Sequence, residues 1–88
     1  MAQVTVEFYG IPRQRAGRAE LAVSAETVAE ALTAVERQCP ALKELVQADG
    51  RVSPHYLVSI EGEHFVSDLQ QPLAAGNRLL VLSADPGG

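Results

Sequence analysis

Gly87 and Gly88, the last two residues of this 88-residue sequence, are the residues whose types and positions best suit a chemical role. Glycine normally serves turns and helix ends, where the backbone adopts positive φ. Two glycines at a chain end instead leave a thin segment without Cβ atoms that ends in a carboxylate. Such a segment can enter a narrow channel of a partner enzyme. Chance or a residual cloning sequence would also place two glycines there, so the rest of the chain must decide.

The other residue types that catalyse reactions or bind metals form no recognisable site. His55 and His64 lack a nearby cysteine and a zinc-site spacing, and we expect both at partly exposed strand edges. Cys39 lies on the apolar stripe of a predicted helix, which favours a buried structural thiol over a nucleophile. Gly10 and Gly17 are not followed by the Lys-Ser/Thr of a phosphate loop. We therefore expect no metal, no bound cofactor and no stand-alone enzyme.

Composition narrows the class of protein. The net charge is −4, and the densest basic group is only Arg13, Arg15 and Arg18. A nucleic-acid surface needs a broader basic area with stacking aromatic residues, so no nucleic-acid partner is expected. The sequence has neither an apolar run of about 20 residues nor a basic and apolar leader, so we expect a cytoplasmic protein that does not bind membranes. One cysteine excludes an internal disulfide, and the length allows one small domain.

Hydrophobic alternation predicts several strands. Val4, Val6 and Phe8 would share the buried face of the first strand. In the last strand, we expect Leu79 and Val81 in the core, with their neighbours facing outward. The predicted strands cover residues 3–9, 19–24, 56–60, 64–66 and 78–83, and residues 10–17 are expected to form a loop.

One helix is predicted between the second and third strands. Thr27 precedes Glu30 by three residues, which is a capping box: the Thr27 hydroxyl would accept from the Glu30 N–H, and the Glu30 carboxylate from the Thr27 N–H. An apolar stripe at helical spacing follows as far as Cys39, and Pro40 ends the helix. Residues 41–46 are expected to add a short helical turn.

These elements predict an α+β protein in which one helix covers one face of a mixed four- or five-stranded sheet. The opposite face would expose an apolar patch beside the chain end, which favours a docking surface for a partner protein over scattered surface side chains. We expect residues 1–83 to form the domain and residues 84–88 a flexible tail. The residues expected to contact the partner are Tyr9, Leu57, Leu80, Leu82, Ala84, Asp85 and Pro86.

Six segments carry a family resemblance through their order and spacing: residues 4–17, 26–32, 39–42, 59–63, 72–79 and 87–88. Together they resemble the ubiquitin-like (β-grasp) sulfur carriers, most closely the small subunit of molybdopterin synthase and the thiamin sulfur carrier. The resemblance covers nearly the whole chain. Glu61 stands where the family usually has Asn, Asn77 where it has Asp, and residues 84–86 are less apolar than in that small subunit, which leaves the branch of the family open.

The resemblance implies a β-grasp fold and a reaction at the chain end. An E1-like adenylyltransferase would use ATP to adenylate the carboxylate of Gly88, the residue that follows Gly87. Sulfur would then displace AMP and leave a thiocarboxylate. The sulfur would go to molybdopterin through the large synthase subunit, within a heterotetramer. The alternatives are sulfur donation for thiamin through a thiazole synthase, sulfur donation for cysteine, a ubiquitin-like protein modifier joined through Gly88, or a plain interaction module with idle glycines.

Overall fold

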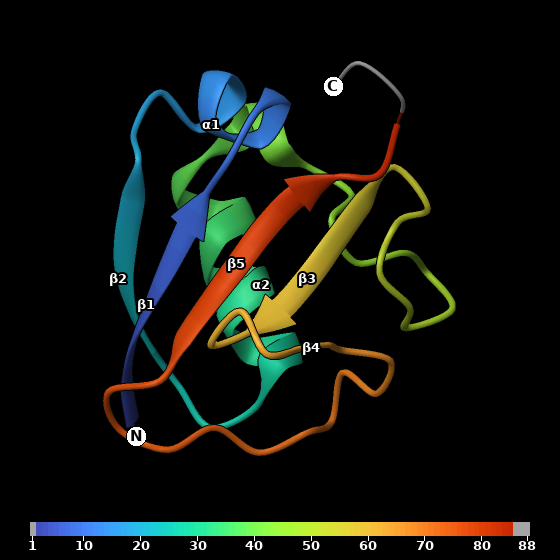
Figure 1. Ribbon diagram of the computed structural model, residues 1–88. Helices are drawn as coiled ribbons and strands as arrows, with labels where there is room; N and C mark the ends of the chain where they lie inside the picture. The colour runs from blue at the N-terminus through green and yellow to red at the C-terminus, as the bar shows by residue number, and fades with distance from the viewer. Residues whose placement is uncertain (1, 86–88) are drawn as a thin grey trace.

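Five strands form one mixed sheet in the order β2-β1-β5-β3-β4 (Figure 1). The computed structural model describes residues 2–85. The last strand, β5, lies at the centre of the sheet, parallel to β1 and antiparallel to β3. The predicted α+β class is confirmed, with five strands rather than four. The strands are β1 (Ala2–Phe8), β2 (Glu20–Ala25), β3 (Tyr56–Ile60), β4 (His64–Phe65) and β5 (Arg78–Ser83).

The main helix, α2 (Val28–Gln38), begins at the predicted cap. The Thr27 hydroxyl accepts a hydrogen bond from the Glu30 N–H at 3.2 Å. The second half of the predicted capping box is wrong, because Glu30 Oε1 accepts from the Glu26 N–H, at 2.9 Å, and not from Thr27. Thr27 has an extended backbone and forms a β-bridge with Pro72. The Glu26 N–H, rather than the Thr27 N–H, therefore lies within reach of the Glu30 carboxylate.

The core lies between α2 and one face of the sheet. The apolar stripe of α2 is buried, and Cys39 is 4% exposed, in the buried position that its place on the stripe predicted. In β5, Leu79 and Val81 are fully buried while Leu80 and Leu82 are half-buried on the other face, which confirms the predicted alternation. Among residues 2–85, no helix is long and apolar enough to cross a membrane.

The predicted loop over residues 10–17 is wrong, because most of it is a short helix, α1 (Ile11–Ala16). Pro12 favours the first helical turn since its φ is already helical and it needs no amide partner there. Gly17 ends the helix in the left-handed conformation, with φ 72°, and its N–H donates to the Arg13 carbonyl at 3.0 Å. The same Gly and Pro signals that mark a loop therefore mark the two ends of one helix.

Smaller differences concern element ends. The helical turn after α2 is a 3₁₀ helix, η1 (Pro40–Leu42), which is shorter and earlier than the predicted 41–46. Tyr9 follows β1 rather than ending it, and Val66 lies outside β4. These ends differ because strand pairing, which depends on distant residues, decides where a strand stops.

We expect Thr27→Ala to lower the free energy of unfolding by about 1 kcal/mol, because the Glu30 N–H loses its hydroxyl acceptor. Thr33→Ala, in the middle of α2, is the matched control and should be neutral or slightly stabilising, since alanine is the better helix former. Urea unfolding followed by circular dichroism measures both. Equal stabilities for the two variants would show that the cap does not hold α2.

Candidate functional site

The chain leaves the sheet from its central strand. Beyond Ser83, where β5 ends, the Ala84 N–H donates to the His55 carbonyl at 2.9 Å. The Asp85 N–H donates to Ser83 Oγ at 3.2 Å, and the Asp85 carboxylate lies 3.2 Å from the His55 ring nitrogen Nδ1. Ala84 and Asp85, the first two residues of the predicted tail, therefore run beside the residue that precedes β3.

The contact between His55 and Asp85 joins residues far apart in the sequence, and no local sequence pattern predicts it. Their side chains are 68% and 55% exposed, so water and salt screen the pair and it adds little to stability. Together with the Ala84 hydrogen bond, this contact holds the start of the tail against the beginning of β3 and so sets the direction in which the chain leaves the sheet.

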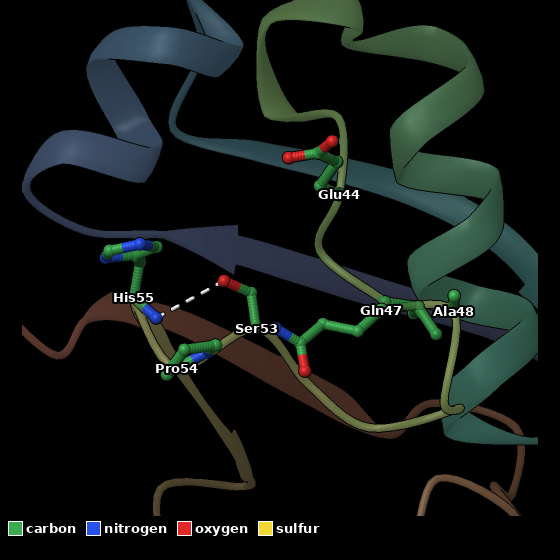
Figure 2. A pocket seen from close by; sticks show the side chains of 7 residues that line it. Glu44, Gln47, Ala48, Ser53, Pro54 and His55 are labelled. Atoms are coloured by element: carbon green, nitrogen blue, oxygen red, sulfur yellow. Dashed lines mark hydrogen bonds between the residues drawn. The ribbon is translucent and has the colours of Figure 1, made fainter.

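Two hollows share His55 at this end of the sheet. One, of about 320 Å³, lies between α1 and the tail and includes Arg15, whose Nη1 donates to the Tyr56 hydroxyl at 2.5 Å. The other, of about 340 Å³, lies beside the loop that leads into β3 (Figure 2). There the His55 N–H donates to Ser53 Oγ at 3.3 Å. Within residues 2–85, no three His, Cys, Asp or Glu side chains gather as metal ligands would.

The sheet face opposite α2 carries an apolar cluster, which we call the open-face patch: Leu57, Phe65, Leu80 and Leu82. Leu57 is paired with Leu82, and Ser59 is paired with both Leu80 and Phe65, so all four side chains lie on one face. Leu57 is 39% and Phe65 63% exposed. The structure thus brings together three of the predicted contact residues. It adds Phe65, which the sequence analysis missed although the alternation on either side of the 61–63 turn could have indicated it.

A polar rim borders this patch on the side of β1. Arg78 contacts Glu7 through its Nε, and its Nη2 lies 3.5 Å from Glu20. The hydrogen bond from the Tyr9 hydroxyl, and then the one from Arg78, lower the pKa of Glu7 below its usual value. The hydrogen bond to the same carboxylate raises the pKa of the Tyr9 hydroxyl above its usual value. Tyr9, 42% exposed, therefore lies in the rim rather than in the apolar cluster.

Pro86, Gly87 and Gly88 lie outside the described residues, so their predicted roles stay predictions. What the described residues offer is a binding geometry. An apolar patch with a charged rim occupies one face, and the chain leaves the sheet at the end of β5, the strand that supplies half of the patch.

Comparison with known proteins supports this description. No protein-family model matches the chain, and no curated protein matches it. Among solved structures, it is similar to SAMP1 from Haloferax volcanii, with 26% identity over 99% of this chain and 100% of that one and a TM-score of 0.83.

Two further solved structures contain complexes. The chain is similar to one in the BexX/CysO complex from Amycolatopsis orientalis, with 24% identity, 97% and 99% coverage of this and that chain, and a TM-score of 0.80. It is also similar to one in the complex of subunits 1 and 2 of molybdopterin-converting factor from Helicobacter pylori, with 22% identity, 98% and 99% coverage, and a TM-score of 0.65.

The resemblance predicted from the sequence is thereby confirmed at the level of fold, over essentially the whole length of each similar structure. This chain has one main helix over a mixed five-stranded sheet, and its fold matches that of these structures. The chain has the ubiquitin-like β-grasp fold, as do the solved structures to which it is similar.

Proposed function

We propose that this protein is a sulfur carrier that acts through the carboxylate of Gly88. A terminal carboxylate is ionised at neutral pH and is a poor electrophile, so it must be activated. In the proposed reaction the carboxylate attacks the α-phosphate of ATP on an E1-like adenylyltransferase, and pyrophosphate leaves. A sulfide-level donor then attacks the acyl carbon, AMP leaves, and a thiocarboxylate remains.

The observation that carries the proposal is the joint position of the tail and the open-face patch. β5 supplies Leu80 and Leu82 to the patch and leads directly into the tail, so a protein that covers the patch also receives the chain end. Once the Ala84 and Asp85 contacts with His55 and Ser83 open, the chain from Ala84 onward can extend by roughly 17 Å, which is long enough to enter a partner's active site. The carrier then contributes by positioning, which is worth several kcal/mol in a transfer step.

Molybdopterin synthesis is the pathway that we propose first, with the large synthase subunit as the receiving partner. It is supported by the similarity to a chain in the complex of subunits 1 and 2 of molybdopterin-converting factor. The similarity to a chain in the BexX/CysO complex likewise supports a carrier that acts while bound to a partner protein. Donation for thiamin or cysteine uses the same tail chemistry and remains the alternative within this class.

A second function, protein modification, is favoured by the similarity to a small archaeal modifier protein. In that case a lysine amine of a target displaces AMP from the same adenylate, and Gly88 ends in an isopeptide bond. The two functions share every step up to the adenylate, so one preparation can distinguish them.

We expect the protein, when produced together with its adenylating enzyme and a sulfide donor, to gain about 16 Da because sulfur replaces one oxygen of the Gly88 carboxylate. A variant extended by one residue beyond Gly88 should gain nothing while it folds normally. Intact mass spectrometry measures both. A gain of about 16 Da on the extended variant would contradict the proposal, and a ladder of heavier conjugates on a denaturing gel would favour modification over sulfur donation.

The patch should be required for binding to the adenylating enzyme. Leu82→Glu introduces a charge among the apolar side chains of the patch, at a half-buried position, and should weaken binding at least about tenfold. Gln3→Glu adds the same charge at an exposed position of β1 and serves as the matched control. Isothermal titration calorimetry compares the two affinities, and equal weakening would assign the effect to net charge rather than to the patch.

A further inference from the structure

The outer edge of β2 presents backbone groups that nothing in residues 2–85 uses. The Phe8 N–H donates to the Ala19 carbonyl at 2.9 Å, which marks this pair as a hydrogen-bonded one. Hydrogen-bonded pairs alternate along an antiparallel ladder, so every second residue from Ala19 directs its amide and carbonyl to β1. The residues between them direct theirs outward, and Figure 1 shows β2 at the margin of the sheet. These outward residues are Glu20, Ala22 and Ser24.

β2 has few of the features that usually protect a sheet edge from pairing, since Glu20 is its one charged residue. Its sequence contains no proline and no lysine, and six residues are long enough for a stable ladder. The opposite edge of the sheet, β4, has only two residues. A strand added to this sheet would therefore pair with β2 rather than with β4.

A shallow hollow of about 270 Å³ lies between β2 and α2, and its shape and charge restrict the occupant. Ala29, Thr33 and Ala34 form its small, half-buried middle. Glu30 and Arg37 line the same hollow, seven residues apart on one stripe of α2, so a carboxylate stands toward one end and a guanidinium toward the other. This arrangement is complementary to itself when it is turned by 180°.

We propose that a second copy of this chain pairs with β2, so that two sheets join edge to edge across a two-fold axis. Centring the axis on Ala22 places Glu20 opposite Ser24 of the second copy and lets the outward residues form about six hydrogen bonds between the chains. No two carboxylates face each other in this register, and the smallest side chain, Ala22, lies at the centre.

The helices fit the same symmetry. An axis perpendicular to the sheet keeps both copies of α2 on one face and runs them in opposite directions, so Glu30 of each copy lies beside Arg37 of the other. The small residues between them allow the helices to approach to the usual 8–10 Å, roughly. The open-face patch and Ser83 lie on β3, β4 and β5, away from this interface, so the dimer leaves them accessible.

Charge exchange tests the helix contact. Arg37→Glu and Glu30→Arg should each weaken self-association at least about tenfold, because like charges then face each other across the axis. An equimolar mixture of the two variants should recover dimer formation, since a mixed pair places two acidic side chains against two basic ones. Sedimentation velocity on each variant and on the mixture measures this, with circular dichroism confirming that each variant is folded.

Two results would overturn the proposal. One is a wild-type protein that stays monomeric up to about 1 mM, which would mean that β2 serves a different occupant or none. The other is a dimer whose mixed variants do not recover, which would place the contact on another face.

Amide hydrogen exchange gives an independent readout of the β2 edge. The amides of Glu20, Ala22 and Ser24 should gain protection as protein concentration rises, and Ala22→Pro, which removes an outward N–H, should abolish that gain. Rapid exchange at every concentration would contradict the interface. Sulfur loading at Gly88 does not require the dimer, so its mass shift should persist in Ala22→Pro and keeps the two proposals separate.

Discussion

The pairing of β5 between β1 and β3 is the constraint on which the rest of the structure depends. Leu79 and Val81 are fully buried on the core face of the sheet, and Leu80 and Leu82 form half of the open-face patch on the other face. A one-residue slip of β5 would exchange these two faces, burying Leu80 and Leu82 and exposing the core residues. The register of one strand thus determines the core, the patch and the point at which the chain leaves the sheet.

Polar contacts at the start of β5 reinforce that register. Glu61 accepts hydrogen bonds from the Arg78 N–H at 2.7 Å and from Asn77 Nδ2 at 3.1 Å. Glu61 has φ 56°, a left-handed conformation that favours glycine or asparagine, so these bonds offset a backbone cost. Glu61 and Asn77 are also among the positions that depart from the pattern of the sulfur carriers that the sequence resembles. Because they contact each other, an amide at position 77 avoids the repulsion that a second carboxylate would bring.

Sequence alone could predict what depends on local periodicity. Alternation indicated the strands around Val6 and Leu79, and helical spacing with Thr27 indicated α2 and its cap. The helix α1 was missed because Gly10, Pro12 and Gly17 are compatible with either a loop or a short helix, and only the burial of Pro12 decides. Contacts between distant segments carry no local signal, which is why the contact of His55 with Asp85 was not foreseen.

The candidate site was predictable to the extent that it lies on strands. Leu57, Leu80 and Leu82 were assigned to the open face by parity, and the alternation on either side of the 61–63 turn could have added Phe65, which the structure pairs with Ser59. The β2 edge could not be found from sequence at all, because strand order, not strand identity, determines which strand is unpaired. Strand order also separates the surfaces, because β1 lies between β2 and the strands that carry the patch. A partner on the patch and a second copy on β2 therefore contact different strands apart from Glu20, which belongs both to the charged rim and to the β2 edge.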